Sequence, residues 1–138
     1  MSLWVDVLGR EGHRITRSRR AVMEVLADAQ APLSPQMICE RGRKRHPSLG
    51  LVTVYRTLDL FEDLGLVMRV HRGAGCHGYV LSSPGHRHVV LCDGCGRAEE
   101  FVGADDLDGL IDRVEGHTGY RIDGHLLQLA GLCPVCQA

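Results

Sequence analysis

Residues 50–65, GLVTVYRTLDLFEDLG, are the stretch that decides the fold of the first half of this chain. Val54, Leu58 and Phe61 fall on one face of a helix with 3.6 residues per turn, and polar side chains fall on the other. Gly65 is a typical stop residue, because glycine accepts the left-handed backbone that ends many helices. The pattern therefore predicts an amphipathic helix with one face in a core and a polar face outside it.

Helical segments precede this stretch, and two short strands follow it. Thr16 and Ser34 are good N-cap residues, and Pro35 occupies a first helical position, where proline is favoured. The neighbouring elements are predicted as helices over 3–12, 16–29 and 34–46 and strands over 66–72 and 77–82. Three longer helices followed by a β-hairpin is the order of a winged helix-turn-helix, whose last helix enters the major groove of DNA.

The second half of the chain has a different organisation. Residues 83–87, SPGHR, mark a boundary between two predicted domains, 1–83 and 84–138. The second domain is predicted to contain strands over 88–92 and 97–102, a helix over 105–117 and a last strand over 120–133. It has little core of its own, so we expect a metal or a partner subunit to complete it. The predicted fold class is α+β: an N-terminal winged helix-turn-helix followed by a small α+β domain.

The net charge of −1 over 138 residues hides an asymmetry between the two halves. Residues 1–81 carry 12 Arg and Lys against 8 Asp and Glu, whereas residues 82–138 carry 4 against 9. A basic first half can approach DNA, and an acidic second half can hold cations. No apolar run is long enough to span a membrane, and the N-terminus lacks the apolar core of a signal peptide. We therefore expect a cytoplasmic protein with no membrane partner.

Four cysteines form two matched Cys-x-x-Cys pairs. Cys92 and Cys95 make the first pair, and Cys133 and Cys136 make the second, with 37 residues between the pairs. Two such turns supply the four thiolates that tetrahedral Zn²⁺ accepts, and a reducing compartment disfavours disulfides. Two disulfides or a thiol redox motif are the alternatives. This cysteine quartet predicts a structural zinc site, whose closed shell leaves no open position for catalysis.

Histidines suggest a second metal site. His86 and His88 alternate on a predicted strand, so their side chains point to the same face. His125 lies on the last predicted strand, and the helix over 105–117 carries several aspartates. This histidine cluster with one carboxylate would suit Zn²⁺, Fe²⁺, Mn²⁺, Co²⁺ or Ni²⁺. Scattered, solvated histidines are the alternative.

Four stretches together resemble the ferric uptake regulator family. They are RITRSRRAVMEVL, GLVTVYRTLDLFEDLGLVMR, HRHVVLCDGCGRAEEF and GHLLQLAGLCPVC, in an order and spacing that match over nearly the whole chain. The family consists of dimeric, metal-dependent DNA-binding repressors, with zinc, manganese, nickel and peroxide-sensing branches. The zinc uptake regulators are one of the branches that the chain resembles. The resemblance implies a homodimer that binds palindromic operator DNA and takes no small-molecule substrate. It also implies that the second domain is the dimerisation domain.

The resemblance implies DNA contacts as well. Tyr55 and Arg56 match the Tyr-Arg pair of the family's recognition helix, and Arg19 matches a basic residue that faces the DNA backbone. Arg56 can donate two hydrogen bonds to guanine, and Tyr55 can pack on a thymine methyl group. Thr53 and Arg17 complete the predicted contacts, and Arg17 adds attraction to phosphate.

The same resemblance assigns the metal ligands. The cysteine quartet matches a structural zinc site, and the histidine cluster matches three ligands of a regulatory site at the domain junction. The fourth ligand is an acidic residue on the intervening helix. One extra residue near Ala104 places it at Asp108, with Asp105 as the fallback. Zn²⁺ is the favoured regulatory ion, with Fe²⁺ and Mn²⁺ as alternatives.

A second sensory site found in many relatives is not matched. Where relatives carry histidines three and five positions before the first cysteine, this chain has Val89 and Arg87. Where they carry a glutamate on the second wing strand, it has Val80, and only Glu100 keeps an acidic character. We expect that site to be absent or rebuilt. The missing histidines argue against the peroxide-sensing branch, in which metal-ligand histidines at those places are oxidised.

Residues around the hairpin turn are the candidates for a rebuilt site. His71, Cys76 and His77 cluster there and, with Glu100 and Asp105, form the auxiliary metal candidates.

The sequence thus predicts a metal-responsive, sequence-specific transcriptional repressor that controls metal homeostasis. The alternative is a metal-independent winged-helix DNA-binding protein whose zinc is purely structural. A small zinc enzyme or thiol oxidoreductase is disfavoured, because no general base and no nucleophile motif accompanies the quartet.

Overall fold

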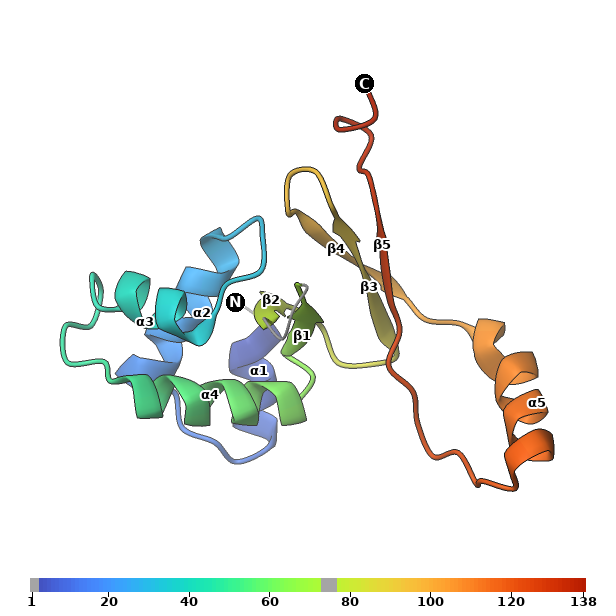
Figure 1. Cartoon of the computed structure of the whole chain (residues 1–138). Helices are drawn as coiled ribbons and strands as arrows, with labels where there is room; N and C mark the ends of the chain where they lie inside the picture. The colour runs from blue at the N-terminus through green and yellow to red at the C-terminus, as the bar shows by residue number, and fades with distance from the viewer. Residues whose placement is uncertain (1–2, 73–76) are drawn as a thin grey trace.

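The computed structural model describes residues 3–72 and 77–138. Its elements are α1 (Leu3–Arg10), α2 (Arg17–Asp28), α3 (Pro35–Gly42), α4 (Leu51–Asp63), β1 (Val67–His71), β2 (His77–Leu81), β3 (Arg87–Cys92), β4 (Ala98–Val102), η1 (Asp105–Leu107), α5 (Asp108–Thr118) and β5 (Gln128–Gly131). Helices α1–α4 and the β1–β2 hairpin form the N-terminal half, and the other elements form the C-terminal half (Figure 1). The predicted α+β fold class is confirmed. Among the described residues, no helix combines the length and apolar character that a membrane span requires.

Local sequence sets the helix ends of the N-terminal half. The Thr16 hydroxyl accepts a hydrogen bond from the Arg19 N–H at 3.1 Å, and the Ser34 hydroxyl accepts one from the Met37 N–H at 3.2 Å. These caps satisfy N–H groups that have no partner inside the helix. Gly65 lies just beyond α4 with a φ of 75°, as expected of a stop residue.

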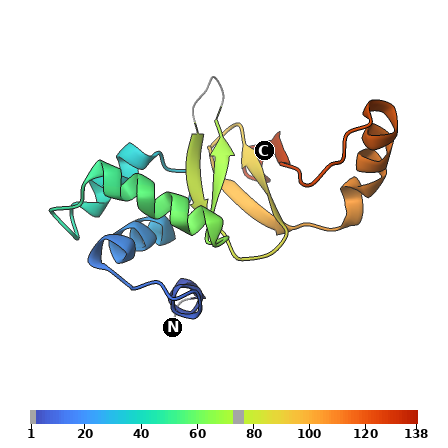
Figure 2. The same cartoon turned by 90° about the horizontal axis from the view of Figure 1, so that it is seen from below.

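Buried apolar side chains fill the space between α2, α3, α4 and the hairpin. Val54, Leu58 and Phe61 of α4 are 0% exposed, as the predicted apolar face requires. Ile38 of α3 and Tyr79 of β2 belong to the same core. With this face buried, α4 lies along the outer side of the helical half (Figure 2).

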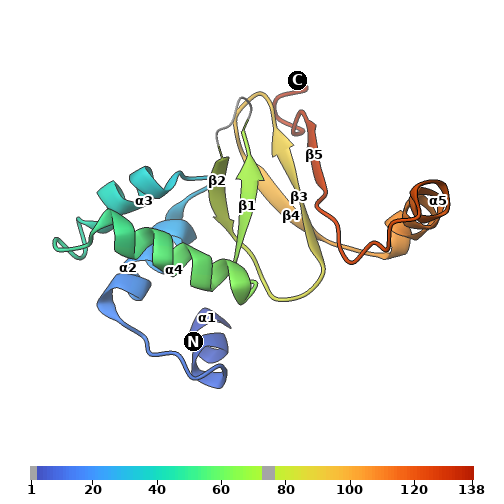
Figure 3. The same ribbon diagram turned by 60° about the horizontal axis from the view of Figure 1, so that its bottom comes forward.

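Two small sheets meet where the halves join. Strands β1 and β2 pair antiparallel, and in the second sheet β3 lies between antiparallel β4 and parallel β5. Val70 of β1 packs with Val89 and Leu91 of β3 in an apolar cluster of its own. The sheets therefore lie side by side between the helices and α5 (Figure 3).

The last part of the chain departs from the prediction. The helix expected over 105–117 divides into η1 and α5, and the strand expected over 120–133 is reduced to β5. Extended backbone needs a neighbouring strand, and residues 120–127 have none within the described chain. All of α5 is described, none of its residues is buried, and it projects away from both sheets (Figures 1 and 3).

The C-terminal half exposes a large apolar surface. Val102, Tyr120, Leu126 and Val135 are each at least 68% exposed. The chain exposes 8921 Å² in all, whereas a compact monomer of this mass exposes about 7,100 Å². The excess of roughly 1,800 Å² is on the scale that a partner subunit covers.

Candidate metal centres and DNA-facing helix

The cysteine quartet comes together where β3 and β5 end. Cys92 is the last residue of β3 and pairs in register with Gly131 of β5, so the turns that follow the two strands are neighbours. The four Sγ atoms all lie within 4.8 Å of one another. The described cysteines, which are the quartet and Cys39, are free thiols, so the alternative of two disulfides is not formed.

Backbone donors stabilise negative charge on the quartet. Cys92 Sγ accepts hydrogen bonds from the N–H groups of Gly94, Cys95 and Cys133 at 3.3, 3.4 and 3.3 Å. These bonds, that from Cys133 first, lower the pKa of Cys92 to about 6. Hydrogen bonding to the Cys133 sulfur is the largest cause that raises the pKa of Cys136 to about 12. Sulfurs this close resist joint ionisation, and a bound dication relieves that repulsion.

Gly94 provides the room that the quartet needs. A Cβ added at this position would lie 2.8 Å from Cys136 Sγ, which is closer than van der Waals contact allows. Converging sulfurs, backbone donors and a closely packed glycine together fit a tetrahedral ion that prefers thiolates, such as Zn²⁺.

The histidine cluster lies at the junction of the halves, at the opposite end of β3 from the quartet. His86 precedes β3, and His88 lies on it. His125 was predicted to lie on the last strand, but it precedes β5. His86 Nε2 lies 2.9 Å from His125 Nε2, and one nitrogen of each ring lies within 4.8 Å of the others. Rings at this separation fit one shared ion, since Zn–N bonds are about 2 Å long.

The surroundings of His88 favour the form that binds metal. His88 is 5% exposed. Burial, followed by the nearby His86 and His125, lowers the pKa of His88, whereas Asp106 acts in the opposite direction. Imidazole binds metals in its neutral form, which a lowered pKa maintains.

The carboxylates predicted for this site do not join the histidine cluster in the described chain. Asp108 begins α5 and Asp105 begins η1, and in the described chain neither joins the histidine nitrogens within 4.8 Å. Asp106, which lies between them, is the carboxylate whose charge acts on His88. The structure thus gathers three histidine nitrogens, and Asp106 is the carboxylate whose charge opposes the lowering of the pKa of His88.

Gly103 is a site residue that sequence reasoning misses. Its N–H donates to the His86 carbonyl at 2.6 Å. A Cβ at this position would lie 2.7 Å from the His86 ring, so glycine lets the chain pass directly against the imidazole. The contact depends on the pairing of β3 with β4, which places Arg87 opposite Val102 and which no local pattern reveals.

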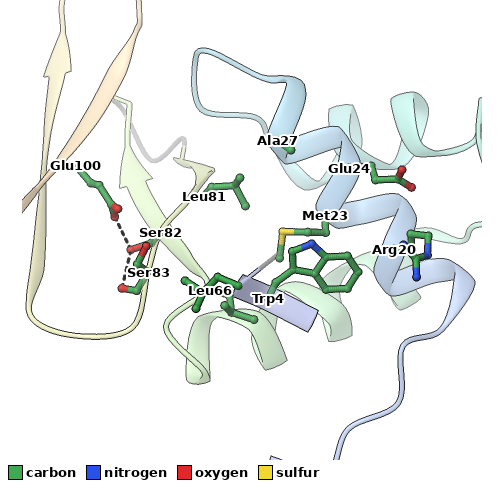
Figure 4. A pocket seen from close by; sticks show the side chains of 11 residues that line it. Trp4, Arg20, Met23, Glu24, Ala27, Leu66, Leu81, Ser82, Ser83 and Glu100 are labelled. Carbon is green, nitrogen blue, oxygen red and sulfur yellow. Dashed lines mark hydrogen bonds between the residues drawn. The ribbon is translucent and has the colours of Figure 1, made fainter. Parts of the chain in front are cut away.

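Within the described residues, the auxiliary candidates do not join the metal-ligand group of the histidine cluster. Glu100 accepts a hydrogen bond from the Ser82 hydroxyl at 2.7 Å, at one edge of a pocket lined largely by apolar side chains (Figure 4). His71 ends β1, and its ring lies edge-on to His77 with 6.5 Å between the ring centres. Cys76 lies outside the described residues.

Positions of the unmatched second sensory site belong to the apolar junction. Val89 is 2% exposed and packs with Val70, and Val80 packs against the same cluster. An apolar contact therefore occupies the place where the resemblance implies that many relatives bind a metal.

Helix α4 presents the predicted DNA contacts on its outer face. Thr53, Tyr55 and Arg56 are exposed. The Tyr55 hydroxyl accepts a hydrogen bond from the Gln36 side chain at 3.3 Å, so α3 helps to position this ring. Sequence reasoning misses this contact, because the two helices meet only in the folded core.

The predicted arginines lie in the first turn of α2. Arg17 is exposed, and Arg19 is partly exposed. The Arg19 guanidinium donates to the Arg14 carbonyl at 2.7 Å, which holds it against the preceding loop.

Known proteins share both the sequence pattern and the fold. The family model described as ferric uptake regulator family matches residues 10–130. The chain is 32% identical over 131 residues to the ferric uptake regulation protein of Legionella pneumophila, covering 91% of this chain and 93% of that protein. The chain belongs to the ferric uptake regulator family. It is also 28% identical over 134 residues to the peroxide operon regulator of Bacillus subtilis, covering 96% of this chain and 90% of that protein.

Members of the ferric uptake regulator family are dimeric DNA-binding regulators of transcription that respond to metals, not enzymes. The predicted family and regulator class are therefore confirmed. A solved zinc uptake regulator complexed with zinc and DNA superposes with a TM-score of 0.79 at 22% identity, covering 96% of this chain and 89% of that one. This likeness shows the shared fold.

Proposed function

We propose that this member of the ferric uptake regulator family is a repressor of metal-homeostasis genes that is activated by Zn²⁺. The histidine cluster carries the proposal, because its nitrogens converge at the junction of the two halves. Three imidazoles and one carboxylate, from Asp106 or Asp108, suit four-coordinate Zn²⁺, and Fe²⁺ and Mn²⁺ are the alternative activating ions. A site at the junction can influence how the DNA-binding half is held.

We assign the cysteine quartet to a structural Zn²⁺. Four thiolates complete its shell and leave no exchangeable position. The quartet joins the turns after β3 and β5, so its occupation stabilises the C-terminal half without contacting the junction.

The two proposed domains have different roles. Residues 1–83 bind DNA through α4, with Arg56 on guanine and Tyr55 on a thymine methyl, and residues 84–138 bind metal and dimerise. A dimer presents two α4 helices to half-sites about one DNA turn apart, which a palindromic operator provides. His86 and His88 would hold the ion from the start of β3, and His125 would hold it from the segment before β5, so a bound ion would link the two segments. Bringing these histidines together restricts the orientations that the winged half can adopt relative to the C-terminal half. This restriction shifts the population towards the dimer that can bind DNA.

Fluorescence anisotropy on DNA from upstream of this protein's own gene tests the proposal. The wild type and the double variant H86A/H125A are stripped of weakly bound metal, retain the quartet zinc, and are titrated with Zn²⁺, Mn²⁺ or Co²⁺ at fixed salt. We expect Zn²⁺ to tighten wild-type binding by about 5- to 150-fold and to leave the double variant unchanged. H13A/H46A, which removes two histidines outside the cluster, is the matched control and should respond like the wild type. An equal metal response in the H86A/H125A variant contradicts the proposal, and tight binding without metal supports the structural-zinc alternative.

A further inference from the structure

Gln128 makes a paired contact between the two halves. Its Nε2 donates to the His71 carbonyl at 2.8 Å, and its Oε1 accepts from the His71 N–H at 2.9 Å. A primary amide presents a donor and an acceptor side by side, as a peptide group does. Gln128 therefore binds the end of β1 in the way that a neighbouring strand would.

This contact lies next to the histidine cluster along the chain. Gln128 begins β5, three positions after His125, and pairs in register with Val89 of β3. Val89 packs on Val70, which immediately precedes His71. The apolar contact between the sheets is non-directional, whereas two hydrogen bonds to one backbone residue restrict both distance and angle.

A single cavity connects the two features in space. It has a volume of about 570 Å³ and lies between the halves, with His71 and Arg69 on one wall and His88, His125 and Gln128 on the other. Movement of the segment that carries His125 would therefore change the shape of a space that Gln128 and His71 also line.

We infer that Gln128 is a positioning residue that transmits the state of the histidine cluster to the winged half. The inference rests on the proposed function, namely metal-dependent DNA binding. The amide pair is formed in the same conformation that brings His86 Nε2 and His125 Nε2 to 2.9 Å. Conditions that favour the gathered histidines therefore also favour the bond to β1, and with it one orientation of the DNA-binding half.

The test replaces Gln128 with methionine, which keeps the length of the side chain and removes both hydrogen-bonding groups. Gln137→Met is the matched control, because the Gln137 amide donates to the Leu132 carbonyl at 2.9 Å within the C-terminal half. Each full-length protein, with its quartet zinc in place, is compared in three ways. These are hydrogen exchange at the His71 backbone amide, Zn²⁺ affinity without DNA, and operator affinity with and without added Zn²⁺.

In the Gln128→Met variant we expect exchange at the His71 amide to be about tenfold faster in the zinc-loaded protein. The zinc-dependent gain in operator affinity should fall about fivefold or more, while operator affinity without added zinc stays at the wild-type value. Gln128→Glu retains the acceptor for the His71 N–H and should keep part of the protection, and Gln137→Met should match the wild type throughout. If Gln128→Met keeps the full zinc-dependent gain, the inference is overturned and the proposed function stands. If the wild type itself shows no gain, both are overturned.

Discussion

Replacing Gly103 with alanine tests whether the position of the His86 ring sets the metal affinity of the histidine cluster. The added Cβ would lie 2.7, 2.8 and 2.9 Å from three atoms of the ring. Carbon atoms normally pack at about 3.5–4.0 Å, so the ring must retreat by roughly 1 Å. Gly103 does not have a positive φ, so alanine itself adds no backbone strain.

The expected effect on the free energy of metal binding is larger than that on the free energy of unfolding. Ligand distances in metal sites hold to about 0.2 Å, so a retreat of this size removes His86 from its position. Losing a contact that holds a metal ligand in place typically weakens metal affinity by about 10- to 100-fold, which is roughly 1.4–2.7 kcal/mol. The His86 ring is exposed and can turn into solvent, so the free energy of unfolding should change by less than about 1 kcal/mol.

Competition with a chromophoric chelator measures the Zn²⁺ affinity, and urea unfolding of the same samples measures stability. Gly109→Ala is the matched control, because its added Cβ would meet nothing within 4 Å. The quartet zinc, counted per chain, should be unchanged in both variants. Zinc affinity of Gly103→Ala within about twofold of the wild type would refute the argument that contact with Gly103 holds the His86 ring.

Three further predictions follow from individual contacts. Gly94→Ala places a Cβ 2.8 Å from Cys136 Sγ, so the purified variant should contain less than one quartet zinc per chain by atomic absorption. Burial lowers the pKa of His88 in the folded state, whereas the unfolded value is about 6.5, so the stability of the histidine-site-empty protein should fall as the pH drops below about 6.5. Urea unfolding across this pH range measures the slope, and His88→Gln should remove that part of it. Arg56→Ala should weaken specific operator binding by about 1–3 kcal/mol in anisotropy titrations, with little change on unrelated DNA.

Each of these predictions has an outcome that contradicts it. Full zinc occupancy in Gly94→Ala would show that the quartet tolerates a side chain at that position. A pH slope that survives His88→Gln would assign the titration to another group. An equal loss of affinity on all DNA sequences in Arg56→Ala would assign that residue to phosphate contact.

Much of the fold follows from interactions between residues a few positions apart. Thr16 and Ser34 cap helices through N–H groups three residues away, and Gly65 acts on the turn that it follows. The two Cys-x-x-Cys turns are equally local, so any fold that joins them produces a four-sulfur site. The surroundings of the histidine cluster were less predictable, because the position of the nearby aspartates depends on how the chain turns between β4 and α5.

The sequence by itself determined the winged-helix order, the amphipathic character of α4 and the grouping of the cysteines in pairs. Only the tertiary structure decided which groups meet at the junction: Gly103 against the His86 ring, His86 beside His125, and Gln128 on β1. These contacts require β3 to pair with both β4 and β5, because that pairing brings together residues far apart in the chain. Hydrophobic periodicity reports which face of an element is buried but not which distant residue lies opposite, and strand register settles that only in the folded protein.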